Sequence, residues 1–343
     1  MKALFIGLGS IGQRHLRNLA AVMPQGFEIM AVRRTRSVPF LNEQMEVAGD
    51  SCHLVERYGI TEFSELAEAL DQGPDLVYVC NPSVFHVPDA YAALNSGAAV
   101  FIEKPLGSSW LGVDDLLEAA TTGKIMVGFQ FRFHPHIQRI NQLIKAGALG
   151  RIVGATFVNS EYLPHWHSYE DYRHSYAAQT ALGGGALLTQ IHELDLAQWF
   201  LGRPHSVYAV GGHLSDLEVD VEDSVSVMLA YRSEDRSFPV TIHLDYLGYP
   251  AERSLTVTGD RGKVYWSQQS GELTISNIED ARVETFTSPG FERNQMFVEQ
   301  TQHFLKFALG QAAPSVSVAE AAVSLQIALA AQESMRLGRP VAL

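Results

Sequence analysis

The first twenty residues, MKALFIGLGSIGQRHLRNLA (1–20), decide how the first half of the chain is expected to fold. Residues 1–6 are an apolar run with the length and bulk of a buried strand. Residues 7–12, GLGSIG, form a predicted turn, and helical spacing begins at Gln13. The order strand, glycine turn, helix is typical of a unit that holds phosphate groups, because the amino end of the helix faces them with N–H groups and a favourable dipole.

The three glycines of the turn have separate roles in such a unit. Gly7 permits the tight turn, Gly9 lets the backbone approach a pyrophosphate, and Gly12 lets helix and strand pack closely. Ser10 and Ile11 lie between them in the predicted phosphate turn. A GxGxxG pattern also occurs in ordinary tight turns, but the strand before it and the helix after it favour nucleotide binding here.

The composition indicates a globular chain with two domains. At 343 residues the chain exceeds what one hydrophobic core usually organises. Apolar residues make up 46% and charged residues 18%, which is ordinary for a globular protein. The formal charge of -13 would repel the phosphate backbone of nucleic acids and anionic lipid heads. Neither nucleic acid nor a membrane surface is therefore an expected partner.

Two further features bear on location and metal binding. The chain opens with one lysine and enters an apolar strand directly, with no cleavable apolar segment and no later run of membrane-spanning length. A cytoplasmic location is therefore expected. Cys52 and Cys80 are the only cysteines and lack C-x-x-C spacing, which argues against a disulfide framework and a thiolate metal site.

The pattern of the chain changes between residues 128 and 150. Up to Gly128, strand-like apolar runs alternate with helical stretches, which predicts an α/β Rossmann domain (1–128) with a doubly wound parallel sheet. Later runs alternate apolar and polar residues, which predicts an open, mostly antiparallel sheet in an α+β domain (129–343) for substrate binding and oligomerisation. Two amphipathic stretches, 293–310 and 317–338, are expected to be closing helices that pack back on the chain.

The second strand of the first domain ends AVRRTR (31–36), without an acidic residue. A cofactor with a free ribose 2'-hydroxyl usually meets an Asp or Glu at this place, about 20 residues past the glycine turn. Arg33 and Arg34 can instead bind a 2'-phosphate through charge-assisted bonds, so NADP(H) is predicted over NAD(H). If these arginines only form a solvated basic loop, NAD(H) is the alternative cofactor.

Two further polar segments fall at the carboxyl ends of predicted strands, where ligands of such sheets bind. One is Asn81-Pro82, and the other is Glu103-Lys104-Pro105. Lys104 can hydrogen-bond a reacting hydroxyl or carbonyl oxygen beside a nicotinamide, although a single lysine is more often a surface charge. Pro105 makes a rigid turn there, for which a cis peptide bond is an option.

A strongly apolar helix is predicted after three glycines in LGGGALLTQIHELDLAQWFLG (182–202). It carries His192, with Asp195 three residues further on. A single histidine on an apolar face is usually a satisfied core residue. The glycines at the entrance of the helix would, however, let a ligand approach closely, which favours a functional histidine.

Five motifs together resemble the Gfo/Idh/MocA oxidoreductases, the glucose-fructose oxidoreductase and inositol dehydrogenase group. They are, in order, GLGSIGQRH (7–15), CNPSVFH (80–86), EKPLG (103–107), VGFQFRFHP (127–135) and GGGALLTQIHELD (183–195). The closing helices are similar as well, so the resemblance covers nearly the whole chain. It implies hydride transfer between a nicotinamide and a carbon that bears a hydroxyl or carbonyl, usually on a sugar, cyclitol or sugar derivative.

The resemblance also implies roles for residues. Lys104 corresponds to the EKP lysine that contacts the reacting oxygen, and His192 to the helix histidine, a general acid/base. Both are therefore the expected catalytic and substrate-contacting residues. The segments that line the nicotinamide half of the cofactor site include Asn81, Pro82, His86, Glu103 and Lys104 itself.

One position departs from the family pattern. Many members carry an acid three or four residues before the helix histidine, where this chain has Leu188 and Thr189. The usual Lys-Asp-His set therefore lacks its acid. Proton transfer would fall to the histidine or the lysine, or would involve a neighbour such as Glu193 or Tyr176.

A polar-aromatic segment, residues 161–185, precedes the histidine helix. Its side chains could stack on a sugar ring and bond hydroxyls or an acidic substituent, and the predicted substrate residues are Tyr162, Trp166, Arg173 and Tyr176. The segment resembles a family branch with EDYR-x-SYAA, often associated with surface-polysaccharide or acidic-sugar metabolism. The HWH at 165–167 lacks a nearby Cys or carboxylate of metal-site geometry, so no metal is predicted.

The leading hypothesis is an NADP-dependent dehydrogenase or reductase that acts on a small carbohydrate-like molecule. Members of this family commonly assemble through the open face of the second-domain sheet, so the resemblance implies a homo-oligomer, a dimer or tetramer. If the terminal helices cover that face, a monomer is the alternative. An alternative of another class is a sensor or regulator that keeps the dinucleotide site without catalysis, as the missing acid suggests. A third hypothesis is an enzyme that holds NAD tightly through a closed redox cycle.

Overall fold

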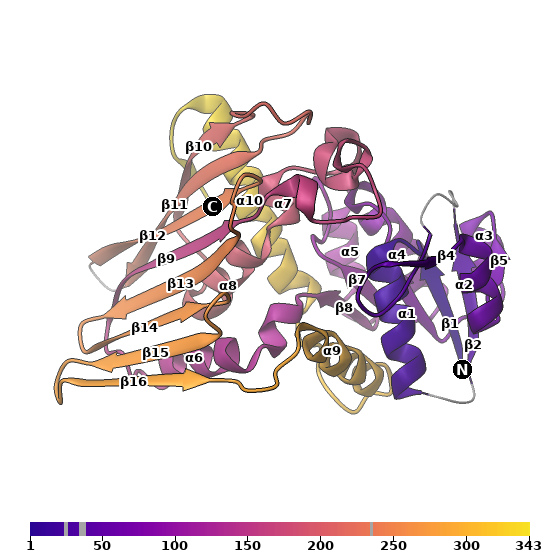
Figure 1. The fold of residues 1–343 in the computed structure, drawn as a ribbon, viewed down its shortest axis with the longest axis horizontal. Coiled ribbons are helices and arrows are strands. Elements are labelled where there is room, and N and C mark those ends of the chain that lie inside the picture. Colours follow the sequence, from indigo (N-terminus) through magenta and orange to yellow (C-terminus); the bar gives the residue numbers. More distant parts are fainter. Residues whose placement is uncertain (24–26, 34–38, 234–235) are drawn as a thin grey trace. The chain divides into compact units, whose positions relative to one another are not determined.

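The computed structural model describes residues 1–23, 27–33, 39–233 and 236–343 (Figure 1). The described chain divides into two compact units. The first unit comprises Met1–Gln130, His167–Asp171 and Arg293–Ala322. The second comprises Phe131–Trp166, Tyr172–Glu292 and Val323–Leu343. Each unit therefore draws on segments that are distant in the sequence.

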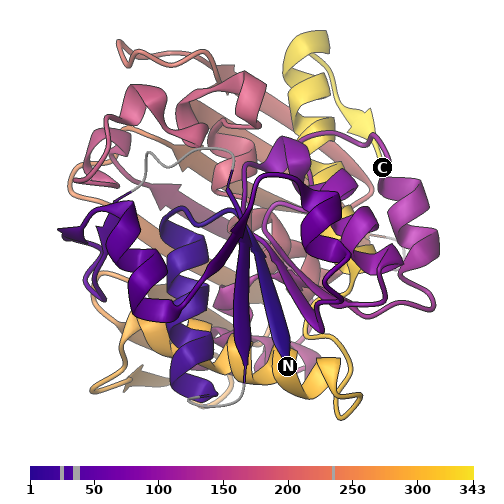
Figure 2. The same cartoon turned by 90° about the vertical axis from the view of Figure 1, so that its right-hand side faces the viewer.

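Six parallel strands form the sheet of the first unit, and Figure 2 shows them side by side. In spatial order they are β5 (Thr61–Phe63), β2 (Glu28–Val32), β1 (Lys2–Ile6), β6 (Leu76–Val79), β7 (Ala99–Glu103) and β8 (Ile125–Gly128). The chain steps from β1 toward one edge of the sheet and from β6 toward the other. This reversal between β1 and β6 is the switch point at which doubly wound sheets bind ligands. The doubly wound parallel sheet predicted from the sequence is confirmed.

Helices cover both faces of this sheet. Right-handed crossovers place α1 and α4 on opposite faces, because β1–α1–β2 and β6–α4–β7 step in opposite directions. The helices of this unit are α1 (Ser10–Val22), α2 (Ser51–Tyr58), α3 (Leu66–Leu70), α4 (His86–Asn95), α5 (Val113–Ala119), α9 (Arg293–Ala308) and the short η1 (Ser83–Phe85). A two-stranded ribbon, β3 (Phe40–Leu41) and β4 (Val47–Gly49), follows the second strand.

Aromatic side chains fill the face of the sheet beneath α1 and α9. The ring of Phe5 stacks on Tyr78 with 4.8 Å between centroids, and Tyr78 lies 5.4 Å from Phe101. Phe304 of α9 packs edge-on against Tyr78 and Phe101, at 5.2 and 5.4 Å. Burial of one such side chain stabilises a fold by about 1.5–3 kcal/mol. Helix α9 is therefore part of the first unit's core, although it lies near the end of the chain.

The second unit is built on one nine-stranded sheet. In spatial order its strands are β16 (Arg282–Thr287), β15 (Glu272–Asn277), β14 (Gly262–Ser267), β13 (Glu252–Gly259), β9 (Ile152–Ser160), β12 (Arg236–Asp245), β11 (Ser224–Ser233), β10 (Ser206–Gly212) and β17 (Val341–Ala342). Neighbouring strands are antiparallel except for β9 and β12. The open, mostly antiparallel sheet predicted from the sequence is confirmed.

Helices pack on one face of this sheet, where α7 and α8 contact the central strands. The helices of this unit are α6 (Pro135–Lys145), α7 (Ala186–Thr189) and α8 (His192–Leu201), with short helices η3 (Leu163–His165), η4 (Tyr172–His174), η5 (Tyr176–Ala178) and η6 (Thr180–Leu182). Two elements begin in the first unit and end in the second, η2 (Gln130–Phe133) and α10 (Val318–Leu337). No helix within the described residues is long and apolar enough to cross a membrane. The expected cytoplasmic location and the expected lack of nucleic-acid partners stay predictions.

Two helix boundaries differ from the sequence-based expectation. Helix α1 begins at Ser10 and not at Gln13, because the first helical bond runs from the Gln13 N–H to the Gly9 carbonyl, at 2.9 Å. The single helix predicted after the three glycines of the stretch 182–202 is broken between α7 and α8. At the break the Gln190 side chain donates to the backbone carbonyl of Asp245, at 2.9 Å. This bond to a distant strand has no counterpart in local helical spacing.

Candidate functional site

The glycine turn lies at the carboxyl end of β1, beside the ends of β2 and β6. The Gly7 N–H donates to the Val32 carbonyl of β2, at 3.1 Å. Gly7 has φ +92°, and a Cβ there would lie 3.0 Å from the Asn81 backbone. A Cβ on Gly12 would lie only 2.3 Å from the Gly7 carbonyl oxygen. A side chain at either position would therefore force backbone atoms of the turn or of the neighbouring strand end to move.

Gly9 has a different environment. Its φ is -67°, and a Cβ built on it would meet nothing within 4 Å. Gly9 is the N-cap of α1, and no side chain of the described residues caps this end of the helix. Ser10 and Ile11 are the first two residues of α1. Open space beside uncapped helical N–H groups fits the diphosphate of a dinucleotide.

His86 joins the ends of β6 and β7. Its Nε2 lies 2.7 Å from the Asn81 carbonyl oxygen, and its Nδ1 lies 2.7 Å from the Pro105 carbonyl oxygen. Burial lowers the pKa of His86, and the two carbonyl acceptors oppose that effect. A neutral imidazole donates to one of the two oxygens at a time. The loop with Asn81 and the loop after Lys104 are thus held together by one buried side chain.

A buried pair connects α1 to the strand end that carries Lys104. The Nε2 atom of His15 lies 2.6 Å from Glu103 Oε1. The other carboxylate oxygen of Glu103 accepts a bond from the Lys104 N–H, at 3.1 Å. The Lys104–Pro105 peptide bond is cis. Sequence reasoning assigned no role to His15, although it ends the GLGSIGQRH motif.

The first unit therefore gathers most of the predicted cofactor residues at the carboxyl ends of β1, β6 and β7. They are Gly7, Gly9, Ser10, Ile11, Gly12, Asn81, Pro82, His86, Glu103 and Lys104. Of the two predicted arginines, Arg33 donates to Glu62 at 3.0 Å, and its side chain is buried. Arg34 lies outside the described residues.

His192 opens α8 and is buried in the second unit. The ring of Phe131 packs edge-on against it, with 5.1 Å between centroids. The next residue, Glu193, accepts a bond from Arg253 Nε at 2.7 Å, and the guanidinium of Arg253 lies 3.8 Å from the centroid of Phe131. Burial raises the pKa of Glu193, and Arg253 opposes that rise. The candidate catalytic histidine therefore stands beside a buried aromatic ring and a buried ion pair.

A second buried ion pair anchors α8. Arg132 donates from Nε and Nη2 to the two carboxylate oxygens of Asp195, at 3.0 and 2.7 Å. The two side chains are only 3% and 1% exposed. Asp195 lies in the predicted histidine helix and Arg132 in the VGFQFRFHP motif (127–135), but the sequence predicts a role for neither. The available signal was an arginine and an acid inside otherwise apolar segments.

Tyr246, which the sequence reasoning did not identify, connects the polar-aromatic segment to α7. Its hydroxyl lies 2.6 Å from Thr189 Oγ1 and donates to the Ala177 carbonyl oxygen at 3.1 Å. Its ring packs edge-on against Trp166, with 5.3 Å between centroids. Burial raises the pKa of Tyr246. Thr189 and the buried Leu188, where the family pattern has an acid, thus contribute a hydroxyl and an apolar side chain.

The other predicted substrate residues lie in more exposed surroundings. Tyr162 is half-buried, and its ring packs edge-on against His165, with 4.9 Å between centroids. Tyr176 is half-buried as well. Arg173 is exposed and donates to Glu218 at 3.1 Å. The four predicted substrate residues of the polar-aromatic segment therefore do not share one environment.

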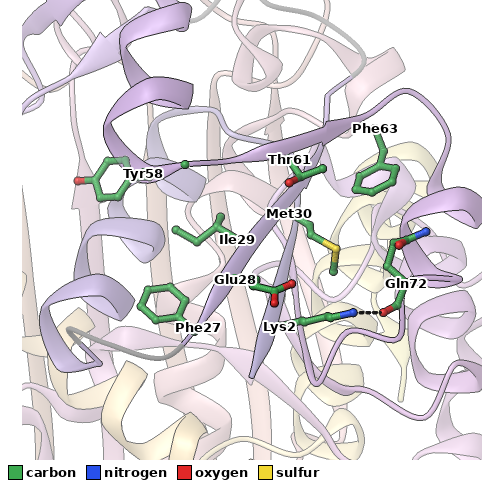
Figure 3. A pocket seen from close by; sticks show the side chains of 10 residues that line it. Lys2, Phe27, Glu28, Ile29, Met30, Tyr58, Thr61, Phe63 and Gln72 are labelled. Atoms are coloured by element: carbon green, nitrogen blue, oxygen red, sulfur yellow. Dashed lines mark hydrogen bonds between the residues drawn. The ribbon is translucent and has the colours of Figure 1, made fainter.

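A pocket of the first unit lies away from this strand end (Figure 3). Its lining includes Lys2 and Glu28, the first residues of β1 and β2, and Lys2 Nζ donates to the Gln72 carbonyl oxygen at 2.8 Å. Doubly wound sheets bind ligands at the opposite, carboxyl ends of their strands. The pocket is therefore not a candidate for the dinucleotide. No group of three or more His, Cys, Asp or Glu side chains in the described ranges could hold a metal ion.

Comparisons with known proteins bear on both units. Residues 1–131 match a family model described as an oxidoreductase family with an NAD-binding Rossmann fold, and residues 137–265 match the GFO/IDH/MocA C-terminal domain. The scyllo-inositol 2-dehydrogenase (NAD(+)) of Bacillus subtilis (strain 168) is 25% identical over 356 residues, which span 100% of this chain and 96% of the relative. The myo-inositol 2-dehydrogenase of Thermotoga maritima is 25% identical over 354 residues, which span 100% and 98%.

Solved structures share the fold. A levoglucosan dehydrogenase in complex with NADH and L-sorbose aligns with a TM-score of 0.82 at 19% identity, over 100% of this chain and 98% of that one. The WlbA dehydrogenase of Bordetella pertussis in complex with NADH and UDP-GlcNAcA aligns with a TM-score of 0.80 at 22% identity, over 100% and 98%. With both family models matched in order along the chain, this protein belongs to the Gfo/Idh/MocA family of oxidoreductases.

Proposed function

We propose that this protein is an NAD(P)-dependent dehydrogenase or reductase that acts on a hydroxyl or carbonyl carbon of a sugar, cyclitol or sugar derivative, including acidic sugars. Two relatives that align over 96% and 98% of their length are inositol 2-dehydrogenases, which supports a polyol-like substrate. The observation in this chain that carries the proposal is the glycine turn. Gly9 leaves open space beside the uncapped α1, and only the end of β6 lies between the end of β1 and the strand end that carries Lys104.

A dinucleotide would be held at the carboxyl ends of β1, β6 and β7. The turn at Gly9 and the amino end of α1 would bind its diphosphate. Asn81 and Glu103 would border its nicotinamide half, as the family resemblance implies. When bound, the nicotinamide supplies or accepts the hydride. A preference for NADP(H) stays a prediction that rests on Arg33 and Arg34.

Lys104 and His192 would perform the proton chemistry. The Lys104 ammonium would donate a hydrogen bond to the reacting oxygen and stabilise the negative charge that develops there. His192 would take the hydroxyl proton when the alcohol is oxidised and return it when the carbonyl is reduced. The same two groups serve both directions.

Buried acceptor atoms near His192 support a substrate with several hydroxyl groups. In the described parts of the chain, Gln190 Oε1, Glu193 Oε2 and Asn159 Oδ1 are buried and accept no hydrogen bond. Asn159 is paired in register with Arg253, the partner of Glu193, so these atoms belong to one region of the sheet. A buried acceptor without a donor is unfavourable by about 1–3 kcal/mol. The O–H groups of a polyol would supply such donors.

The test combines binding and turnover. Calorimetric titration with NADH and NADPH is followed by an absorbance assay for reduced nicotinamide, with inositols, neutral sugars, uronic acids and acylamino sugars. Lys104→Ala and His192→Ala should each lower turnover by about 10²-fold or more. His205→Ala, at an exposed histidine, should keep wild-type turnover.

Other results would favour the two alternative hypotheses. Dinucleotide binding without turnover of any compound in the panel would contradict the proposed enzyme and support the sensor. Cofactor that stays bound through purification and is not consumed would support the closed redox cycle. A protein that binds neither dinucleotide would contradict all three hypotheses.

We further propose that the sheet face opposite α7 and α8 binds a second copy of the chain, giving a dimer or tetramer. In-register residues form one uncharged row across this face, namely Tyr208, Met228, Thr241, Thr156, Thr256 and Tyr265. Met228 is 50% exposed, and the two tyrosines at the ends of the row are 38% and 42% exposed. Exposed apolar side chains with few charges are typical of the centre of homodimer interfaces.

Sedimentation analysis tests this interface. Met228→Glu should shift the protein toward the monomer, because it places a charge within the uncharged row of the proposed contact. Leu111→Glu, at an 86% exposed residue of the first unit, should leave the assembly unchanged. A monomeric wild type, or a Met228→Glu variant with the wild-type mass, would contradict the proposal.

A further inference from the structure

Arg33 occupies the position that distinguishes the two nicotinamide cofactors in Rossmann domains. It directly follows β2, where an acid binds the ribose 2'-hydroxyl or a basic residue accepts a 2'-phosphate. The residue before it, Val32, accepts the bond from the Gly7 N–H at 3.1 Å, so this strand end adjoins the glycine turn. The Arg33 N–H donates to the Phe63 carbonyl at the end of β5, at 3.4 Å.

The guanidinium of Arg33 is engaged by an acid from the neighbouring strand. Arg33 Nη1 lies 3.0 Å from Glu62 Oε1, and the two side chains are 4% and 20% exposed. Ala31 and Glu62 are partners in the β2–β5 register. Because side chains alternate along a strand, Arg33 projects from the same face as Ala31 and therefore as Glu62. The bond follows from the pairing of two strands and does not depend on a flexible loop.

From this geometry we infer that Glu62 is a specificity-determining residue that limits affinity for NADP(H) relative to NAD(H). A 2'-phosphate carries a charge of about -1.5 to -2 at neutral pH. To bind Arg33 it would have to share the guanidinium with a carboxylate of like charge. NAD(H) carries an uncharged hydroxyl at that position, so Glu62 does not oppose its binding.

The end of β2 carries no acid, and Glu62 on the neighbouring strand β5 lies beside Arg33 in its place. Rossmann domains that bind NAD(H) usually carry the acid at the end of the second strand itself. Here the acid is 29 residues further along the chain, and the sheet order places it beside Arg33. The inference rests on the proposed function only in that a dinucleotide binds at the glycine turn.

The experiment measures the dissociation constants of NADH and NADPH by calorimetry for the wild type and three variants. Glu62→Gln should raise the affinity for NADPH by about tenfold or more, because one like charge a few ångström from the phosphate is removed. Its affinity for NADH should change by less than about twofold, since an uncharged ribose hydroxyl responds weakly to that charge. Glu28→Gln, the same change at the exposed first residue of β2, should alter neither constant.

The third variant tests whether the effect passes through Arg33. In Glu62→Gln/Arg33→Ala the gain in NADPH affinity should disappear. If Glu62→Gln does not fold, as judged by its melting curve, Glu62→Ala is measured in its place. The quantity compared is the ratio of the two dissociation constants, which a general loss of structure would not change selectively.

Three results would overturn the inference. The first is an unchanged NADPH affinity in Glu62→Gln, and the second is an equal change for both dinucleotides. The third is a gain that persists without Arg33. If the ratio of the NADPH to the NADH dissociation constant is the same in the wild type and in all variants, the inference fails and the proposed function stands. If the wild type binds neither, the proposed function fails and the inference falls with it.

Discussion

Alanine at Gly12, compared with alanine at Gly9, should separate the packing role of the glycine turn from its binding role. A Cβ at this position would lie 2.3 Å from the Gly7 carbonyl oxygen and 3.2 Å from the Gly7 carbonyl carbon. Both atoms are backbone, so no side-chain rotation relieves the contact. Gly12→Ala therefore has to move the first turn of α1 away from the end of β1.

The expected magnitude is a balance of two effects. Overpacking in a tight core is typically unfavourable by about 1–3 kcal/mol. Alanine is preferred over glycine inside a helix by about 1 kcal/mol, and Gly12 lies within α1. The clash and the gain together give a net loss of up to about 2 kcal/mol. In a domain of this size that loss corresponds to a decrease in melting temperature of up to roughly 8 °C.

Gly9→Ala is the matched variant. Its φ of -67° suits any residue, and its Cβ would meet nothing within 4 Å, so the melting temperature should stay at or slightly above the wild-type value. The same Cβ would project into the space assigned to the diphosphate. The affinity for NADH should therefore fall by about tenfold or more, while Gly12→Ala lowers both stability and affinity.

Calorimetric binding and thermal unfolding of the two variants check this reasoning. A Gly12→Ala protein with wild-type melting temperature and NADH affinity would show that the contact with Gly7 relaxes without loss, and would refute the packing argument. A Gly9→Ala protein that binds NADH as the wild type does would refute the placement of the diphosphate at this turn.

Two further predictions concern the second unit. Asp195→Asn removes the charge beside the buried Arg132 and should lower the free energy of unfolding by about 3–5 kcal/mol in urea denaturation. The control Glu333→Gln, in an exposed ion pair, should leave that free energy unchanged. Equal stability of the two variants would contradict the prediction for Asp195. Burial lowers the pKa of His134 from 6.5 to about 3, so the stability that His134 contributes is present above about pH 6.5 and is lost as pH falls toward 3. His134→Asn keeps an N-cap acceptor for α6 and should reduce the slope of unfolding free energy against pH in that window by up to about 1.4 kcal/mol per pH unit. His205→Asn, at an exposed histidine, should keep the wild-type slope. A wild-type slope in both the His134→Asn and the His205→Asn variants would refute the prediction.

Much of the fold follows from local patterns. The apolar run at β1, the glycine turn and the helix after it are contiguous, so their order alone predicts the first βα unit. Alternation with a period of two likewise predicts the sheet of the second unit, because one face of each strand is buried. Gly7, Asn81 and Lys104 could be predicted as cofactor-site residues because they lie within two residues of a strand end, and the carboxyl ends of parallel strands meet at one edge.

The contacts between distant segments could not be predicted this way. His15 and Glu103 are 88 residues apart, and Glu193 and Arg253 are 60 apart. The break before His192 likewise depends on a bond from Gln190 to a remote strand.

The sequence by itself therefore determined the two-domain α/β and α+β plan, the nucleotide turn and the family resemblance, because turn chemistry and burial periodicity are properties of short segments. Only the tertiary structure decided that Glu62 neutralises Arg33, that Arg253 pairs with the acid beside His192, and that α9 completes the first core. Those pairings depend on strand order and register, which arise when segments far apart in the chain pack together.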